Sequence, residues 1–441
     1  MTNQKIKSNH YQDLAGSCGP NLKSKSPKLL IVGQGYVGLP LTIRAIEAGY
    51  NVVGFDIDEK RVSSLRSGQS YIDDISNGQI KAALKTGLFT PSKDEQDCIN
   101  FDVAVITVPT PLKDGKPNVS FIEDASNLIS KYLTTGSLVI LESTSYPGTV
   151  ESVVAPILET SGLTSGVDFH LAFSSERIDP VNKLWDIVNT PKVIGGVGNL
   201  SLKEAQKFWE TIIDTTVPVS NPKVAEFSKL LENTFRYVNI SLINELAMYA
   251  NSLDIDIWEA IEAASTKPYG FMPFKPGAGA GGHCLPIDPH YLSWAIEQNG
   301  HNFRFANLAS EINKEMPPHV VGRITKSLKK QELCISDSDI LVIGNSYKAN
   351  CGDNRESPAE EVTKLLVDTG ANVNVHDPLV DKRYRNPDYN WVELNESQIQ
   401  SADLVVVLVN HDCIDGQLIT EYSNQVFDIC HCLIGENVEY L

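Results

Sequence analysis

Apolar residues in this chain fall into short runs of strand length, separated by amphipathic stretches of helical length. In the first half, five such runs predict strands at residues 28–32, 51–56, 101–108, 137–141 and 169–173. The stretch 39–48 between the first two runs has helical character and stops at Gly49. Strands that alternate with helices are typical of parallel α/β sheets. The first half of the chain is therefore expected to be an α/β domain.

The pattern changes after Pro218 and Pro222. Residues 224–253 contain no internal proline or glycine and follow the helical period, which predicts one long helix. Strand runs return at 339–343, 372–376 and 403–409, with a helix expected at 358–369. The pattern predicts an α/β protein: two Rossmann-like, doubly wound domains joined by a long central helix and a small helical middle domain. The expected divisions are a flexible polar extension at 1–27 and domains at 28–217, 218–330 and 331–441.

A glycine-rich turn, Gly33-Gln-Gly35-Tyr-Val-Gly38, follows the first strand run directly, and the second run ends in Asp56. This spacing inside a βαβ unit predicts a dinucleotide site. Gly33 permits the tight turn, Gly35 lets the backbone approach a pyrophosphate, and Gly38 lets the helix pack closely on the strand. The free N–H groups of that helix would face the phosphates. Asp56 can accept hydrogen bonds from ribose hydroxyls and would repel a 2′-phosphate, which favours NAD over NADP.

Charge and composition narrow the partners of the protein. The 441 residues include 37 Lys and Arg against 55 Asp and Glu, a formal charge of −18 that disfavours nucleic acid and anionic membrane surfaces. No apolar run approaches the ~20 residues of a membrane span, so no membrane insertion is expected. The eight cysteines are scattered, which favours a reducing cytoplasm over a disulfide framework. No metal is expected, because the cluster Cys430-His-Cys432 lacks a second ligand pair at zinc spacing.

The most unusual segment is the glycine-rich loop at residues 276–289, in which Cys284 follows four glycines and precedes Asp288 by four residues. Four glycines leave little side-chain bulk, so a ligand could approach the backbone closely. A thiolate exposed there could attack an aldehyde. The residues alone support a catalytic and a structural cysteine equally. Thr144 and Glu176 follow predicted strands and are further site candidates, although such residues can also be helix caps or turn formers. Lys229 and Asn233 share one face of the predicted long helix and are candidates too, although they could equally be a solvated pair.

Taken together, these segments resemble the UDP-sugar 6-dehydrogenase family, from residue 28 to the C-terminus. Seven signatures occur in the family's order: Gly33-x-Gly35-Tyr36-Val37-Gly38, Val108-Pro-Thr-Pro111, Glu142-Ser-Thr144, Ser175-Glu176-Arg177, Lys229-Leu-Leu-Glu-Asn233, Gly281-Gly-His-Cys284 and Arg355-Glu-Ser-Pro358. The resemblance implies a four-electron oxidation of a sugar C6 alcohol to a carboxylate, with two NAD reduced. It also implies a homodimer or larger homo-oligomer with the long helix at the interface.

The resemblance also implies roles for individual residues. Cys284 would be the nucleophile, and Lys229, Asn233 and Asp288 would manage proton transfer and the oxyanion. Glu176 and Thr144 match positions implicated in water activation. The implied NAD contacts are Gly33, Gly35, Tyr36, Val37, Gly38, Asp56, Arg61, Thr110 and Thr144. The implied UDP-sugar contacts are Glu176, Arg177, Lys229, Asn233, Phe274, Gly281, Tyr347 and Lys348.

The segment 266–274 resembles the branch of the family that acts on UDP-N-acetylglucosamine and supplies uronic acids for bacterial capsule or O-antigen. UDP-glucose and UDP-N-acetylmannosamine are the alternatives within the family. The chain departs from the family pattern at Ser175, Val181 and Ala278, and Cys430 replaces a usual arginine. Loss of that arginine removes a bidentate donor near the nucleotide-sugar site or a subunit contact. Two other classes stay open: a non-catalytic nucleotide-sugar-binding relative, and a redox-sensing or cysteine-only aldehyde dehydrogenase.

Overall fold

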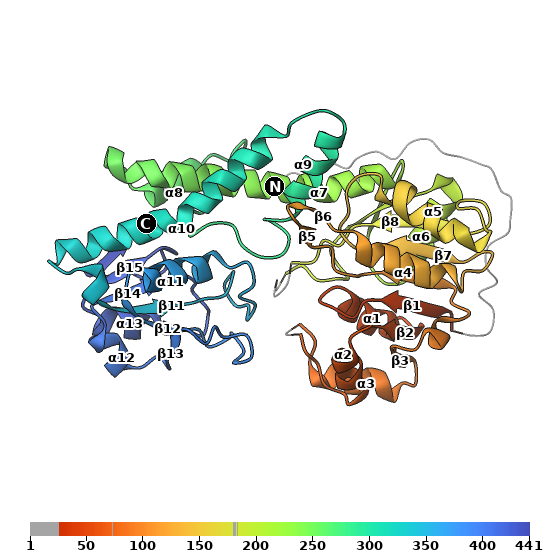
Figure 1. The fold of residues 1–441 in the computed structure, drawn as a ribbon, viewed down its shortest axis with the longest axis horizontal. Helices are drawn as coiled ribbons and strands as arrows, with labels where there is room; N and C mark the ends of the chain where they lie inside the picture. Colours follow the sequence, from red (N-terminus) through yellow and green to blue (C-terminus); the bar gives the residue numbers. More distant parts are fainter. Residues whose placement is uncertain (1–25, 73, 180–181, 183) are drawn as a thin grey trace.

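The computed structural model describes residues 26–441 except 73, 180–181 and 183. Residues 1–25 of the expected N-terminal extension, and the family departure at Val181, lie outside the described residues. Two α/β bodies lie side by side, and long helices run across both of them (Figure 1). The predicted architecture of two Rossmann-like bodies and a central helix is confirmed.

The first body contains an eight-stranded sheet of order β10-β9-β8-β7-β4-β1-β2-β3. Its strands are β1 (Lys28–Val32), β2 (Asn51–Phe55), β3 (Phe89–Ser92), β4 (Val103–Ile106), β7 (Leu138–Leu141), β8 (His170–Ser174), β9 (Lys192–Gly196) and β10 (Thr216–Val219). The six neighbouring strands β3-β2-β1-β4-β7-β8 are parallel and follow the Rossmann order. Strand β9 runs antiparallel to β8, a reversal that the apolar pattern does not predict.

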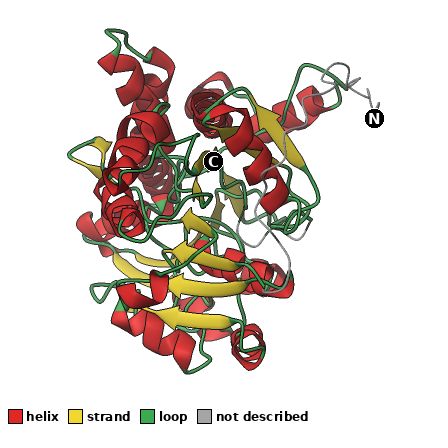
Figure 2. Cartoon of the chain, turned by 90° about the vertical axis from the view of Figure 1, so that its right-hand side faces the viewer, coloured by secondary structure: helices red, strands yellow, loops and turns green. Residues whose placement is uncertain are grey.

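Helices cover both faces of this sheet, as Figure 2 shows from the side of the first body. Strand β1 explains why: Leu29 and Ile31 enter one buried cluster, whereas Leu30 and Val32 enter the other. A strand buried on both faces reads as a continuous apolar run. The helices are α1 (Gly38–Glu47), α2 (Glu59–Arg66), α3 (Asn77–Lys85), α4 (Ser120–Ser130), α5 (Ala155–Leu158) and α6 (Gly198–Trp209), with a small hairpin of β5 (Leu112–Lys113) and β6 (Lys116–Pro117).

The central part is built from α7 (Pro222–Ala250), α8 (Ile257–Ser265), α9 (Asp288–Gln298) and α10 (Arg304–Lys330). Helix α7 starts where Asn221 caps it, with the Asn221 side chain accepting the backbone N–H of Val224 at 3.1 Å. The predicted helix at 224–253 is thus two residues longer at its start, and its last turn, Asn251–Leu253, is a 3-10 turn. Helix α10 packs along α7 and on α11 (Pro358–Asp368), so it links the central part to the second body.

The second body contains a six-stranded parallel sheet of order β13-β12-β11-β14-β15-β16, which is again the Rossmann order. Its remaining elements are β11 (Asp339–Ile343), β12 (Asn372–His376), β13 (Asn390–Trp391), β14 (Leu404–Val407), β15 (Val426–Asp428), β16 (Val438–Tyr440), α12 (Glu396–Ser401) and α13 (Gly416–Tyr422). The two bodies share their wiring without a sequence repeat. No helix in the described part of the chain has the length and apolar character needed to cross a membrane.

Candidate active site

The glycine turn after β1 has the geometry that its sequence predicts. Gly33 has a φ of +99°, and a Cβ at this position would lie 2.7 Å from the Thr107 carbonyl oxygen. At Gly38 a Cβ would lie 2.5 Å from Thr107 Oγ1 and would overlap the carbonyl oxygen of Gly33. At Gly35, in contrast, a Cβ would meet no atom within 4 Å. The first and third glycines therefore serve packing, and the backbone at Gly35 faces open space.

Asp56 lies at the end of β2, directly beside this turn. Its carboxylate accepts the backbone N–H groups of Gln34 and Asp58, each at 2.9 Å, and Arg61 Nη1 at 3.2 Å. These three hydrogen bonds occupy both lone pairs of Oδ2 and one of Oδ1, so Oδ1 can still accept a hydroxyl. Tyr71 closes the other side by donating its hydroxyl to the Gln34 carbonyl oxygen at 2.5 Å.

These residues fit a dinucleotide such as NAD. The first turn of α1 has no side-chain cap, Val37 occupies its N-cap position, and Tyr36 beside it is 40% exposed. Uncapped N–H groups at a helix N-terminus form an anion site that suits a pyrophosphate. The ring of Tyr36 also lies 5.5 Å from the guanidinium of Arg355, which comes from the second body. The second body thus contacts the edge of the predicted cofactor site.

The glycine-rich loop before α9 packs against the second body. A Cβ at Gly281 would lie 2.7 Å from the Glu356 carbonyl oxygen, and one at Gly282 would lie 2.8 Å from the ring of Tyr347. The Gly282 N–H also donates to the Glu356 carbonyl oxygen at 3.2 Å. The sequence predicts that a ligand approaches the backbone of this loop. At these two glycines the close neighbours are instead a side chain and the backbone of the second body. Glycine here lets the loop that carries Cys284 lie flat on the second body.

Cys284 is an exposed, free cysteine at the end of this loop. Although solvent reaches the residue, the protein atoms packed around its sulfur raise the pKa of the thiol, while the Lys229 ammonium opposes this effect and Asp288 reinforces it. Burial alone would lower the pKa of Lys229, but Cys284, Asp288 and Glu176 raise it above its ordinary value. The site therefore combines a protonated lysine with a thiol whose deprotonation needs a base.

Asp288 is the first residue of α9 and supplies a buried carboxyl beside that thiol. Its backbone N–H donates to the Cys284 carbonyl oxygen at 2.8 Å, and its side chain accepts Asn233 Nδ2 at 2.5 Å. Burial raises the pKa of Asp288 to about 6, an effect that Lys229 and Asn233 oppose. Near neutral pH this carboxyl can accept a proton. The predicted spacing of Lys229 and Asn233 on one face of α7 is confirmed, since both contact the same site.

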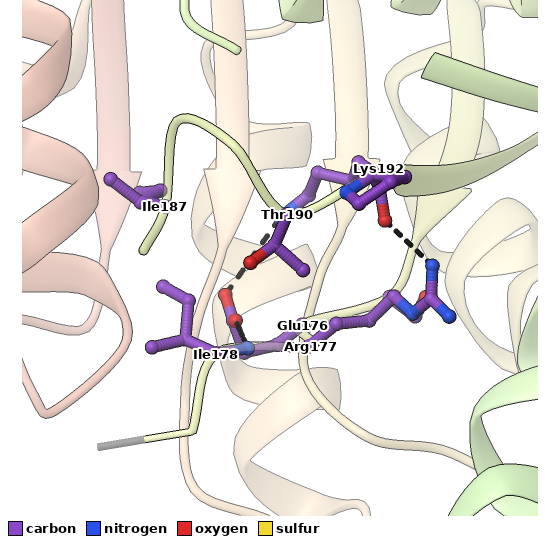
Figure 3. Close-up of a pocket in the computed structure, with 8 residues that line it drawn as sticks. Glu176, Arg177, Ile178, Ile187, Thr190 and Lys192 are labelled. Atoms are coloured by element: carbon purple, nitrogen blue, oxygen red, sulfur yellow. Dashed lines mark hydrogen bonds and ion pairs between the residues drawn. The ribbon is translucent and has the colours of Figure 1, made fainter. Parts of the chain in front are cut away.

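Glu176 lies two residues after the end of β8, and Lys229 Nζ donates to its backbone carbonyl oxygen at 2.5 Å. Its carboxylate accepts the Ile178 N–H and lies 3.7 Å from Lys192 Nζ (Figure 3). Lys192 also forms an ion pair with Glu142, and both of those side chains are buried. A small pocket opens over Glu176 and Lys192.

Arg177, the neighbour of Glu176, contacts α7 and the residue before β9. Its guanidinium forms a bidentate pair with Glu232 on α7, at 3.1 and 2.9 Å, and donates to the Pro191 carbonyl oxygen at 2.6 Å. This arginine fixes the end of β8 to α7, so the described contacts give it a structural use beside the expected substrate contact.

The loop after β11 brings Tyr347 and Lys348 to the site from the second body. Lys348 Nζ forms an ion pair with Asp179 at 2.8 Å, which ties this loop to the segment after β8. Asp377 fixes the backbone of this loop, because its carboxylate accepts the Asn345 and Ser346 N–H groups at 2.8 and 3.0 Å.

The buried ring of His411 completes this support. Its Nδ1 accepts the Asn350 N–H at 2.8 Å, and its Nε2 therefore carries the proton and donates to Asp377 at 3.1 Å. Despite burial, His411 and the backbone donors Asn345 and Leu379 lower the pKa of Asp377 to about 2.

Other predicted residues lie outside this cluster. Phe274 packs on Phe235 of α7, with ring centroids 6.1 Å apart, and contacts the apolar cluster of the central helices. Thr110 contributes its carbonyl oxygen, which accepts the Tyr291 hydroxyl at 2.9 Å. Thr144, three residues after β7, is half-buried.

The departures from the family pattern also have places in the structure. Ser175 and Ala278 are buried. Cys430 donates to the Leu408 carbonyl oxygen at 3.3 Å, and His431 stacks on Trp258 of α8 at 4.8 Å, so this segment packs against the central helices where an arginine is usual. In residues 26–441, outside the four undescribed positions, no group of three or more His, Cys, Asp or Glu could hold a metal ion.

Sequence reasoning missed two groups beside Glu176. Glu142 stood in a recognised signature without a role, and Lys192 stood in a strand that was not predicted. The signal that could have found Lys192 is a charged residue at the start of an otherwise apolar run, Lys-Val-Ile-Gly-Gly. A buried lysine needs a partner, so such a residue points to a nearby carboxylate.

Comparison with known proteins identifies the class to which this arrangement belongs. The chain matches the models of the UDP-glucose/GDP-mannose dehydrogenase family in its NAD binding domain over residues 27–213, its central domain over 223–315 and its UDP binding domain over 341–434. The UDP-N-acetyl-D-glucosamine 6-dehydrogenase of Pseudomonas aeruginosa is 34% identical over 392 residues, which cover 88% of this chain and 91% of that protein.

A second relative bears a different substrate name. The UDP-N-acetyl-D-mannosamine dehydrogenase of Pyrococcus horikoshii is 32% identical over 385 residues, which cover 87% of this chain and 89% of that protein. A solved structure of UDP-D-ManNAc dehydrogenase from the same organism has a TM-score of 0.84 at 31% identity and covers 94% of this chain and 98% of its own. The chain therefore belongs to the UDP-glucose/GDP-mannose dehydrogenase family and is an NAD-dependent UDP-sugar dehydrogenase.

Proposed function

We propose that this protein oxidises the C6 alcohol of a UDP-N-acetylhexosamine, with UDP-N-acetylglucosamine preferred, to the uronic acid. The observation that carries the proposal is the set around Cys284: an exposed thiol, a protonated buried lysine and a carboxyl able to accept a proton. NAD, when bound, accepts the hydrides. The preference for the N-acetylglucosamine derivative rests on residues 266–274 and on the relative from Pseudomonas aeruginosa. The uronic acid would supply a cell-surface polysaccharide.

The side chains then divide the work. Lys229 and Asn233 donate to the oxygen that becomes anionic when the alcohol is oxidised and when sulfur adds to the aldehyde. Asp288 accepts the thiol proton, and Cys284 forms a thiohemiacetal that becomes a thioester after the second oxidation. Glu176 accepts a proton from the water that attacks the thioester. The carbon–sulfur bond then breaks, the acid leaves as carboxylate, and Cys284 regains a proton.

The binding residues of the proposal come from both bodies. The glycine turn Gly33–Gly38, Asp56 and Arg61 would hold NAD, whereas Tyr347 and Lys348 would hold the nucleotide sugar. The protein has a net charge of −18, so these local donors must overcome a repulsive field. The domain divisions at 217/218 and 330/331 follow from this assignment.

Stoichiometry tests the mechanism. We expect two NADH per UDP-sugar consumed, and we expect Cys284→Ala to abolish acid formation. Cys334→Ala is the matched control, because Cys334 is also a free, exposed cysteine but lies in the turn before β11. One NADH per sugar together with a released aldehyde would contradict the thioester route.

A panel of UDP-sugars tests the substrate. UDP-N-acetylglucosamine, UDP-N-acetylmannosamine, UDP-N-acetylgalactosamine and UDP-glucose are compared by kcat/KM with NAD. Highest kcat/KM for the mannosamine derivative would favour the activity named for the Pyrococcus horikoshii relative. A flat profile would remove the preference, and NAD binding without NADH formation from any sugar would favour the non-catalytic alternative.

We also propose that the protein works in the cytoplasm as a homodimer that pairs along α7. Large apolar side chains recur at intervals of three, four or seven residues on its exposed face: Val224, Phe227, Leu231, Phe235, Leu242, Leu246 and Tyr249. A contiguous exposed apolar stripe of this kind marks an interaction surface. Light scattering of Leu231→Glu against the unaltered protein tests the pairing, and a dimer that persists unchanged counts against it.

A further inference from the structure

A buried trio of charged groups lies behind the candidate site. Glu142, Glu176 and Lys192 follow or begin the neighbouring strands β7, β8 and β9. Because β9 is antiparallel to β8, its first residue, Lys192, lies at the edge where β7 and β8 end. The exposed fractions of the three side chains are 0%, 12% and 7% in the order given.

The trio holds two carboxyls but a single cation. Lys192 contacts Glu142 directly, lies 3.7 Å from Glu176, and places its ammonium 4.1 Å from the ring centroid of Trp209. Among the described residues, neither Glu142 Oε2 nor Glu176 Oε2 has a hydrogen-bond partner. Buried polar atoms are rarely left unpaired, so two orphaned oxygens in one cluster need an explanation. One proton shared between the carboxyls pairs both atoms and leaves the trio neutral.

The surroundings decide which carboxyl keeps the proton. Burial, together with the charge of Glu176, raises the pKa of Glu142, although Lys192 opposes the rise. Glu176 is also desolvated, but Lys192, the shared proton donated by Glu142, the Ile178 N–H and Lys229 together lower its pKa. Glu176 thus has more donors than Glu142 and is the ionised member. Cys284, the remaining titratable group that faces it, carries no charge as a thiol.

We propose that Lys192 and Glu142 are positioning residues that keep Glu176 ionised as the base for thioester hydrolysis, with Glu142 holding the shared proton. The inference rests on the proposed function, in which Glu176 takes a proton from the attacking water. The water oxygen bonds to the carbonyl carbon, one water proton goes to Glu176, and the Cys284 sulfur leaves and is reprotonated. Without Lys192, the two carboxyls lose their cation, so Glu176 binds a proton more tightly and stops acting as a base.

Lys192→Met separates the two halves of the reaction. We expect formation of the Cys284 adduct with NADH release to continue, while hydrolysis slows about a hundredfold or more, as for loss of a general base. Intact-mass spectrometry after an acid quench should then show the thioester adduct on Cys284. The acid limb of the kcat–pH profile should move to higher pH. Lys131→Met is the control, because Lys131 forms an exposed ion pair with Glu95 at 2.8 Å.

Glu142→Gln provides a second test, and it leaves no buried charge without its partner. Glutamine keeps a hydrogen-bond donor toward Glu176 but cannot ionise, so we expect a loss of less than about tenfold in hydrolysis and no accumulated thioester. If Glu142→Gln accumulates thioester, Glu142 must titrate and the proton assignment is wrong. A Lys192→Met enzyme with the pH profile of the unaltered protein overturns the role of Lys192. If the unaltered protein forms no NADH with any UDP-sugar, the proposed function fails instead.

Discussion

Alanine substitutions at Gly35 and Gly38 should have different effects, although the two glycines lie three residues apart. Gly38→Ala should lower the stability of the fold, whereas Gly35→Ala should weaken NAD binding. A Cβ at Gly38 would lie 2.5 Å from Thr107 Oγ1 and closer still to the Gly33 carbonyl oxygen, which is backbone and cannot rotate away. Overpacking of this kind costs about 1–3 kcal/mol and occasionally more, and the gain of about 1 kcal/mol from alanine in a helix does not offset it. Because the overlap is with backbone, the cost lies at the upper end of that range, and after the helix gain we expect Gly38→Ala to lower the unfolding free energy by about 2 kcal/mol.

Gly35→Ala should leave that free energy within about 0.5 kcal/mol, because its Cβ meets no atom within 4 Å. The same Cβ would keep a pyrophosphate away from the backbone. Loss of one charge-assisted hydrogen bond costs about 1.5–3 kcal/mol, which weakens NAD binding roughly 10- to 150-fold.

Urea unfolding without NAD measures the stability of each variant, and calorimetric titration with NAD measures its affinity. A Gly38→Ala protein as stable as the unaltered one would refute the packing argument. A Gly35→Ala protein that binds NAD normally would refute the assignment of the open space to the cofactor.

Three further predictions concern single side chains. Because burial raises the pKa of Asp288 to about 6, kcat/KM should fall below that pH as the carboxyl becomes protonated; Asp288→Asn should remove this limb from a measured pH profile. The stability that Asp288 contributes should be present below its ordinary 3.8 and lost as the pH rises through 6, which acid-range urea titrations can check. Arg177→Met should lower the unfolding free energy by about 1 kcal/mol through loss of the Glu232 pair, whereas an unchanged stability with weakened UDP-sugar binding would return Arg177 to a substrate role. His411→Ala should weaken binding of UDP and lower stability by about 1–3 kcal/mol, with NAD affinity unchanged in the same calorimeter; His411→Gln, which can still donate to Asp377, should lose less.

Local sequence predicts most of the fold because each signal has a local cause. The strands β1, β11 and β12 have the predicted bounds, since apolar runs buried on both faces are easily seen. The start of α7 follows from Asn221 and Pro222, a cap and a first-turn proline. The helix α10 contains Pro317 and Pro318, residues that normally end a helix, and no single helix was predicted there.

The candidate site could be predicted only where its residues lie in motifs. Cys284, Lys229, Asn233 and Asp288 come together as the spacing and the family resemblance imply. Lys192 could not be placed, because its position depends on the reversal of β9, and strand direction is a property of the whole sheet. The packing of Tyr347 against Gly282 likewise depends on how the two bodies meet.

The support beneath the loop after β11 has a consequence for the order of events in catalysis. Gly344 donates its N–H to the His376 carbonyl oxygen at 2.8 Å, just as Gly33 donates to Phe55. The second sheet thus repeats the turn of the first, but the two oxygens of its acid, Asp377, already accept His411 and four backbone N–H groups, whereas Asp56 has three donors and one free lone pair. A ribose cannot use that carboxylate, so the described residues of one molecule offer one dinucleotide pocket for the two oxidations of the proposed function. Under the proposed function, the first NADH would have to depart and a fresh NAD enter while the half-oxidised sugar stays in place, so that mechanism requires retention of the sugar.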